Sequence, residues 1–358
     1  METLRKYYGW SFAFAIVAVI GGFAIGYQQS GTFGGALAVA LTVTILAVLE
    51  TSLSFDNAVV NARILSGWDD KWRHIFLTWG IWIAVFGMRI VFPIAIVSIA
   101  TGINPFAVTN MALFNADEYA HHLHAVHHEV AGFGGAFLFM VAFGFFFEEK
   151  HVYWLEALET RLTKLGQIEG VSAAFTLIIL LLVSKLFGSA EQGQQFFIAG
   201  VWGVVTFILA HGLGSLLGGG DEDEDAGNAV AGQVVKAGLA GFLYLEILDA
   251  SFSFDGVIGA FVLTNYLPVI ALGLGVGAFF VRSMTIHLVD AGTLAEYRYL
   301  EHGAFYAIFA LAVLMFGSGI GYELPEWATG LIGAAFIGLA FYNSLSYNRR
   351  EARATTTN

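Results

Sequence analysis

The chain has 358 residues, of which 57% are hydrophobic and only 12% are Asp, Glu, Lys or Arg, with a formal net charge of −12. A soluble domain carries about 25% charged residues, so this supply of charge cannot cover a soluble protein, and the negative balance argues against a nucleic-acid binder. The absence of cysteine excludes disulfides, thiolate metal sites and cysteine nucleophiles. A multi-pass membrane protein remains.

Ten stretches of the chain are long and apolar enough to span a membrane as helices, which needs roughly 20 residues each. They cover residues 9–27, 35–64, 74–100, 131–147, 171–187, 196–217, 236–263, 266–290, 302–321 and 326–345. The first follows Arg5 and Lys6 and lacks a clean cleavage site, so we interpret it as a retained helix and not as a signal peptide. We therefore predict an all-α polytopic membrane protein with about ten transmembrane helices, forming one transporter-like domain over residues 1–345.

The basic residues orient these helices. If both ends of the chain are cytoplasmic, the inside segments hold 13 of the 16 Lys and Arg residues and the outside loops hold none. This positive-inside pattern predicts cytoplasmic N- and C-termini. Residues 148–170 then form a cytoplasmic amphipathic connector, residues 218–228 an acidic cytoplasmic loop that is either a solvated linker or a cation collector, and residues 346–358 a polar C-terminal tail expected to fray.

A short motif occurs twice, as Leu49–Asn57 (LETSLSFDN) and as Leu248–Gly256 (LDASFSFDG), 199 residues later. The copies lie in the second and seventh predicted spans, so they cross the membrane in opposite directions. A span with one arginine, Arg89 or Arg282, follows each copy. We therefore predict an inverted internal repeat, which in secondary transporters places a binding site near the bilayer midplane. The two copies cover about residues 35–147 and about residues 236–321.

The motif helices carry five carboxylates within predicted spans, and each charge at the bilayer centre costs roughly 2.5–3.5 kcal/mol. Such a set needs cations, protons or water around it. Carboxylate, hydroxyl and amide oxygens suit hard cations such as Mn²⁺, Ca²⁺ or Mg²⁺. The predicted metal ligands are Glu50, Ser54, Asp56, Asn57, Glu246, Asp249, Ser253 and Asp255. They lie on two helical stripes, which can face one site only if the helix unwinds near Ser-Phe-Asp.

Other polar residues within the spans have competing interpretations. Arg89 and Arg282 are expected to balance charge or gate the site, and the alternative is a structural network in which they neutralise the aspartates. His287 and Asp290 share a helix face with Ser283 and are candidates for a proton path; a satisfied polar cluster is the alternative.

Residues 101–130 form an extracytoplasmic His-rich segment in this topology. If the segment is helical, Asp117, His121, His124 and His128 share one face. Imidazole is a good ligand for transition metals, so this face is a candidate external metal site. The alternative is a polar amphipathic helix lying on the outer surface.

The motifs resemble those of the TerC family, within the LysE-type transporter group, and look like a TerC-related branch that carries a domain-of-unknown-function label. The family's Glu with Ser-x-Asp-Asn corresponds to Glu50 with Ser54–Asn57, and its later Ser-x-Asp copy corresponds to Ser253–Asp255. The resemblance covers about residues 35–345. It implies a bacterial inner-membrane protein linked to metal-ion efflux, notably of manganese, and by family name to tellurium resistance. Gly256 departs from the family's usual Ser, and Glu246 is an additional carboxylate.

We therefore predict a membrane exporter of a divalent cation, Mn²⁺ or Ca²⁺, that exchanges against protons and uses no organic cofactor. An alternative is a metal-binding membrane scaffold or sensor in a metal or tellurite stress response, and a third is export of a cationic amino acid by analogy with the LysE group. An enzyme is not expected, since there is no His-Glu-x-x-His motif. The expected partners are the bilayer and the metal, with a homo-oligomer or stress-response partners left open.

Overall fold

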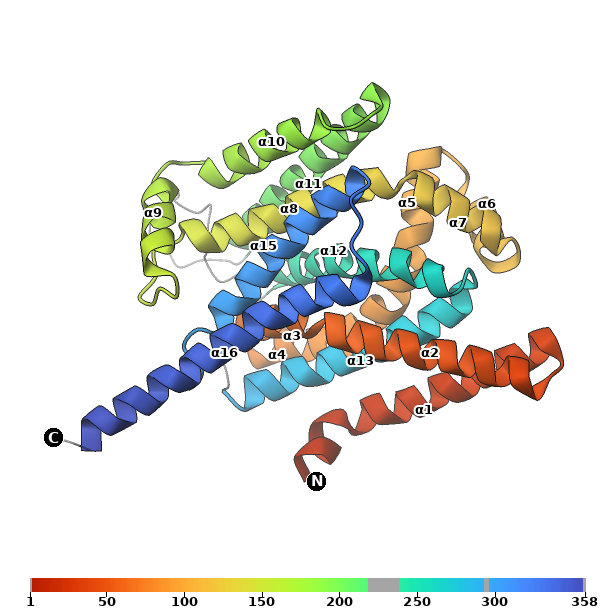
Figure 1. Cartoon of the computed structure of the whole chain (residues 1–358), viewed down its shortest axis with the longest axis horizontal. Coiled ribbons are helices and arrows are strands. Elements are labelled where there is room, and N and C mark those ends of the chain that lie inside the picture. The colour runs from red at the N-terminus through yellow and green to blue at the C-terminus, as the bar shows by residue number, and fades with distance from the viewer. Residues whose placement is uncertain (1, 218–237, 293–295, 357–358) are drawn as a thin grey trace.

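The computed structural model describes residues 2–217, 238–292 and 296–356, and these residues form helices without a β-strand (Figure 1). The helices of the first half are α1 (Glu2–Ser30), α2 (Phe33–Leu53), α3 (Phe55–Ser66), α4 (Asp70–Ile75), the π-helical η1 (Phe76–Gly80) and η2 (Ile83–Val91), α5 (Phe92–Thr101), α6 (Pro105–Phe114), α7 (Ala116–Ala125) and α8 (His127–Phe147). Those of the second half are α9 (Glu156–Gly166), α10 (Val171–Ser184), α11 (Ala190–Leu217), α12 (Leu239–Leu263), α13 (Leu267–Asp290), α15 (Leu300–Gly319) and α16 (Glu326–Thr356). The all-helical fold is confirmed for this part of the chain.

Eight helices of the described chain are long and apolar enough to cross a membrane. A ninth results if α9 and α10, which meet at a bend of 104°, form one broken span. The ten predicted spans all contain helix, but α10 alone has only 14 residues. The 25-residue α12 carries three carboxylates in its sequence, which lowers its apolar character. The chain is thus a multi-pass membrane protein by its apolar helices, with fewer clear spans than the sequence predicts.

Helix α8 is the central helix of one group and is buried along almost its whole length against α10, α11 and α15. Glycines let its backbone approach α11 closely. A Cβ atom at Gly132 would lie 2.5 Å from the carbonyl oxygen of Phe196, and one at Gly203 would lie 2.3 Å from that of Phe133. Small residues at such contacts are typical of helix packing in membranes. There the hydrophobic effect does not drive helices together, and van der Waals contact between closely packed backbones contributes instead.

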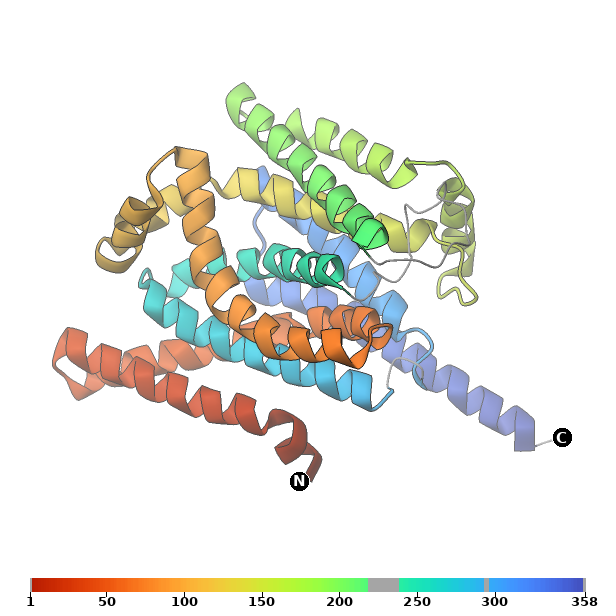
Figure 2. The same cartoon turned by 180° about the vertical axis from the view of Figure 1, so that it is seen from behind.

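A second group of helices contains both motif copies. Helix α13 packs along α1, α2 and α3, while η2 packs along α12 and α13 (Figure 2). The motif helices of the first copy therefore contact the arginine-bearing helix of the second, and the motif helix of the second contacts the arginine-bearing helix of the first. Helix α15 contacts both groups, since it packs on α8 and on α3.

Helix α9 and the C-terminus lie toward one end of the helices, and α6 and α7 lie toward the opposite end (Figures 1 and 2). Helix α16 continues through Thr356, so the polar tail is helical up to that residue. The Arg, Glu and Ala residues of this segment have high helix propensity, which explains why the last span extends into it. The acidic loop at residues 218–228 lies outside the described residues.

Candidate functional site

The two motif copies fold differently. In the first copy the helix breaks at Ser54, which separates α2 from α3 with φ −96° and ψ 20°. The Ser54 N–H still donates to the Glu50 carbonyl oxygen at 3.0 Å, and Asp56 and Asn57 lie in the first turn of α3. In the second copy α12 continues through Ser253 without interruption. The predicted unwinding is confirmed in the first copy and wrong in the second, where continuous α12 keeps its backbone hydrogen bonds.

Glu50 and Arg89 form a buried ion pair. The Arg89 Nη2 atom lies 2.6 Å from Glu50 Oε1, and both side chains are less than 5% exposed. Ser54 Oγ donates to the same carboxylate at 3.4 Å, and Arg89 also donates to the carbonyl oxygen of Ala84. Because a buried pair is held only when its charges are matched, Arg89 cancels the charge of Glu50 in this state.

Two small cavities meet at the helix break. Cavity A, of about 50 Å³, is bounded by the first motif, by Gly256 and by α15 and α16. Its polar lining residues are Glu50, Ser54, Asp56, Asn57 and Thr329. Cavity B, of about 30 Å³, lies between α3, η1, η2, α12 and α13. Its polar lining residues are Ser54, Asn61, Arg89, Glu246, Asp249, Arg282 and Thr285. A water needs about 10–15 Å³, so each cavity has room for a water or a dehydrated ion.

Several buried polar atoms around these cavities have no hydrogen-bond partner. Residues that line the cavities contribute Asn57 Oδ1, Asn61 Oδ1, Arg89 Nε, Glu246 Oε1 and Asp249 Oδ2, and Ser253 of α12, which lines neither cavity, contributes Oγ. Most buried polar groups in proteins are paired, and an unpaired one costs free energy. Five of these six atoms are oxygens, which is the ligand type that hard cations prefer. The cluster can therefore stabilise a cation or ordered water.

Glycines of each arginine-bearing segment provide space for the carboxylates of the other copy. A Cβ atom at Gly277 of α13 would lie 2.1 Å from Glu50 Cγ, and one at Gly80 of η1 would lie 2.9 Å from Glu246 Oε1. Gly256 lies against Glu50 in the same way, with 2.8 Å to Oε2. The carboxylates and the glycines thus come from opposite copies, which explains the glycine at position 256.

The structure brings the predicted metal ligands into two groups and not into one shell. Glu50, Ser54, Asp56 and Asn57 line cavity A, whereas Glu246 and Asp249 line cavity B. The side chain of Asp255 lies outside the described residues. Within the part of the chain that the structure describes, no three His, Asp or Glu side chains are close enough together to hold a metal ion. Ser54 is the residue that lines both cavities.

The other predicted residues of the spans, Arg282, His287 and Asp290, do not all lie at one site. Arg282 lines cavity B and donates through Nε to the carbonyl oxygen of Leu77. His287 and Asp290 lie at the end of α13 and face α1. There His287 Nδ1 lies 3.2 Å from Tyr8 Oη, and Asp290 lies 3.8 Å from Lys6 Nζ. Neither residue lines cavity A or B.

The His-rich segment does not form one continuous face. Helix α7 ends at Ala125 and α8 starts at His127, so the turn at Val126 separates His128 from the residues before it. His128 is buried and lies 2.9 Å from Gln195, while His121 and His124 are exposed. Asp117 accepts a hydrogen bond from Asn265 at 2.7 Å. These four side chains are not brought together as a ligand set among the described residues.

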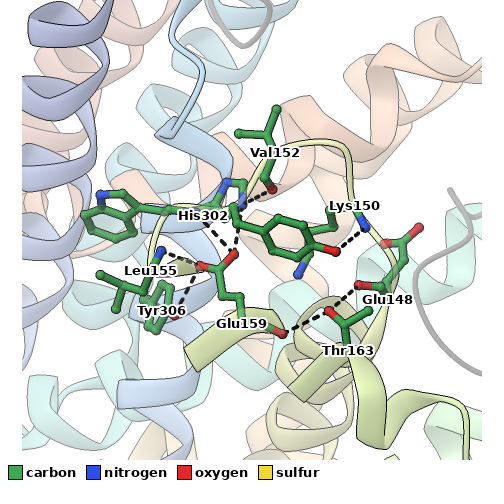
Figure 3. A network of polar contacts seen from close by, with 10 residues as sticks. Glu148, Lys150, Val152, Leu155, Glu159, Thr163, His302 and Tyr306 are labelled. Atoms are coloured by element: carbon green, nitrogen blue, oxygen red, sulfur yellow. Dashed lines mark hydrogen bonds and ion pairs between the residues drawn. The ribbon is translucent and has the colours of Figure 1, made fainter. Parts of the chain in front are cut away.

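A polar network in the connector was missed by sequence reasoning. Glu159 of α9 is fully buried, and its carboxylate accepts from the N–H groups of Trp154 and Leu155 at 3.3 and 3.2 Å and from Tyr306 Oη at 3.2 Å (Figure 3). His302 Nε2 lies 3.3 Å from the same carboxylate and 3.0 Å from the Val152 carbonyl oxygen. The sequence predicted an amphipathic connector without singling out Glu159, and in the structure Leu155 and Leu158 are exposed while Glu159 is buried. These contacts hold the connector and α9 against α15.

One family model matches residues 55–351, which is most of the chain, and its description is a protein of unknown function (DUF475). No curated protein and no solved structure matches the chain.

Proposed function

The chain belongs to the DUF475 family, and from its buried carboxylates we propose that it is a membrane transporter of a divalent metal cation, with Mn²⁺ or Ca²⁺ favoured. The observation that carries the proposal is the cluster of unpartnered buried oxygens from both motif copies around Ser54. A buried oxygen without a hydrogen-bond partner costs free energy, and a bound ligand would offset that cost. The TerC resemblance favours export as the direction of transport.

The charges around the two cavities support a cation as the substrate. Arg89 already neutralises Glu50, and Arg282 is the other cation that lines either cavity. Asp56, Glu246 and Asp249 are buried or half-buried carboxylates beyond that first pair. A divalent cation offsets this excess, and protons do so in its absence, which is the physical basis for proposing exchange against protons.

The packing of the two copies supports alternating access. In the proposed topology ten helices cross a bacterial inner membrane, both termini are cytoplasmic, and the repeats are inverted. Each copy's motif contacts the other copy's arginine-bearing segment, with Gly277 against Glu50 and Gly80 against Glu246. Two halves that contact each other reciprocally can exchange conformations, so the broken and the continuous motif helices are proposed as the two forms of one element.

Reconstitution into vesicles tests the proposal. We expect saturable, proton-coupled uptake of Mn²⁺ or Ca²⁺ by the full-length protein in proteoliposomes, with Zn²⁺ and Mg²⁺ as comparison ions. Asp56→Asn and Asp255→Asn should each abolish the uptake, whereas Asp117→Asn, at the far end of the molecule, should not. Uptake that survives both motif variants would refute the proposal.

Binding without flux would favour the alternative, a metal-binding scaffold or sensor in a metal or tellurite stress response. Equilibrium binding of ⁵⁴Mn²⁺ to the purified protein, measured together with flux, separates the two functions.

A further inference from the structure

A third cavity lies where α8 ends, between the connector, α9 and the start of α10, and none of its lining residues lines cavity A or B. Its volume is about 540 Å³, within the range of about 300–1,000 Å³ that is usual for small-molecule sites. It is lined by residues of opposite character. Glu148, Glu149 and Glu169 bring negative charge, while Lys164 and the first residues of α10 bring positive charge.

The start of α10 supplies an anion-binding element. Gly170 precedes the helix with φ 74° and provides no side-chain cap, and Gly170, Val171 and Ser172 all line the cavity. The N–H of Val171 donates to the carbonyl oxygen of Ile168 at 3.2 Å. The next N–H groups of the first turn have no helical carbonyl oxygen four residues earlier, and together with the helix dipole they favour negative charge. Ser172 is an independent sign of a ligand, because it is 1% exposed and its Oγ has no hydrogen-bond partner. Phosphate oxygens would satisfy both groups.

The glutamates supply the cation-binding element of the same cavity. Thr163 Oγ1 donates to the carbonyl oxygen of Glu148 at 3.2 Å, which fixes the start of the connector over α9 (Figure 3). Burial raises the pKa of the Glu148 carboxyl to about 7, although Lys150 and Arg63 oppose the shift. A cation beside Glu148 would favour its charged form, because an opposite charge lowers the pKa of a carboxyl group.

An apolar surface leads away from the cavity along α10. Phe175, Ile178 and Leu182 are exposed and follow one another at helical spacing along α10, and the exposed Leu186 lies just beyond its end. Helix α10 has 14 residues, which at 1.5 Å per residue gives about 21 Å, less than the hydrocarbon core of about 30 Å. A lipid headgroup can therefore reach the start of α10 where the helix is too short for the bilayer.

We propose that this cavity binds the headgroup of a phospholipid with a primary ammonium group, its phosphate at the start of α10 and its ammonium among the glutamates. The acyl chains lie along the exposed stripe of α10. A purely anionic headgroup would meet three glutamates, and a quaternary ammonium lacks the N–H donors that the carboxylates accept. The inference goes beyond ion transport and does not depend on it.

Native mass spectrometry of the full-length protein tests the proposal. The protein is exchanged into equimolar phosphatidylethanolamine, phosphatidylglycerol and phosphatidylcholine, and the retained lipids are counted. We expect about tenfold enrichment of phosphatidylethanolamine, because its ammonium group donates charge-assisted hydrogen bonds that the other two headgroups lack. Ser172→Ala with Lys164→Gln should abolish this enrichment. The matched control, Ser184→Ala with Lys185→Gln at the other end of α10, should keep it.

Equal retention of the three lipids by the wild-type protein would overturn the proposal, and so would enrichment that survives the Ser172 and Lys164 changes. Displacement of the lipid by free phosphoethanolamine at equal concentration would assign the cavity to a soluble ligand and would also overturn it. Ser172→Thr keeps the hydroxyl and should keep the enrichment. Monodisperse elution and an unchanged unfolding temperature show that a variant which loses lipid is still folded.

Discussion

Glu159 and Glu246 are both buried glutamates, but their surroundings differ. The carboxylate of Glu159 accepts from two backbone N–H groups and a tyrosine and lies beside His302. The Oε1 atom of Glu246 is buried without any hydrogen-bond partner. A buried carboxylate whose oxygens are hydrogen-bonded holds neighbouring elements together. A buried carboxylate oxygen without a partner lowers stability, so folding alone does not explain its presence. The difference separates a structural network in the connector from a candidate binding site in the membrane.

Glu50 lies between these two cases. Its charge is matched by Arg89 at 2.6 Å, yet it also lines cavity A, beside Asp56 and Asn57. The second copy has no described counterpart of this pair, because the hydrogen bond from Arg282 Nε goes to a backbone carbonyl group. The two copies of the motif therefore differ in their ion pairing in this structure.

The largest effect is expected when the buried pair is broken. Arg89→Leu leaves Glu50 buried and unpaired, which should lower the free energy of unfolding by about 3–5 kcal/mol. Arg282→Leu should cost less, since Arg282 Nε donates to the neutral carbonyl oxygen of Leu77. Urea unfolding in detergent, followed by tryptophan fluorescence, measures both. A larger loss for Arg282→Leu would contradict this ranking, and Glu50→Leu with Arg89→Leu should recover part of the stability.

Two matched substitutions test the comparison between the glutamates directly. Glu159→Gln loses charge-assisted hydrogen bonds and should lower the free energy of unfolding by about 1.5–3 kcal/mol, while flux per folded molecule is kept. Glu246→Gln should leave stability unchanged or raise it, because it removes an unsatisfied charge, and should abolish flux. Unfolding and ⁵⁴Mn²⁺ uptake are measured on the same preparations. The comparison fails if both variants lose stability equally.

The glycine contacts are expected to differ between the two copies. Gly277→Ala places a Cβ atom 2.1 Å from Glu50 Cγ, deep in that side chain, and should cost about 1–3 kcal/mol. Gly80→Ala meets the far end of Glu246 at 2.9 Å, which can rotate away, so its cost should be smaller. Gly338→Ala meets no atom within 4 Å and is the control. Unfolding temperatures rank the three, and equal losses would contradict the contacts.

A further effect concerns pH. Burial raises the pKa of Glu148 from its ordinary value of 4.5 to about 7. The folded protein then binds more protons than the unfolded chain between these values, so stability should fall as pH rises from about 4.5 to about 7. Glu148→Gln should remove this part of the pH dependence, whereas Glu149→Gln, at its exposed neighbour, should not. Unfolding temperatures recorded across this range show whether the slope disappears.

The sequence predicted the all-helical, multi-pass architecture because apolar length and composition are local properties of each segment. It also predicted that Glu50 lies near Ser54 and Asn57, which are close along the chain. It did not predict that Glu159 is buried, because helical periodicity identifies a face but not what covers it. The four-residue His-rich face was likewise an extrapolation across Val126, where the helix ends.

The sequence alone determined that this chain spans a membrane several times and carries two related acidic motifs within apolar segments. Only the tertiary structure decided that Ser54 breaks one copy while α12 stays continuous, and that the carboxylates are divided between two cavities. The physical reason is that the two copies share the Ser-Phe-Asp sequence, so this local sequence does not decide between a broken and a continuous helix, and the helices that pack on each copy differ. Arg89 pairs with Glu50, and the α12 glutamate at position 246 is left without a partner for its Oε1 atom.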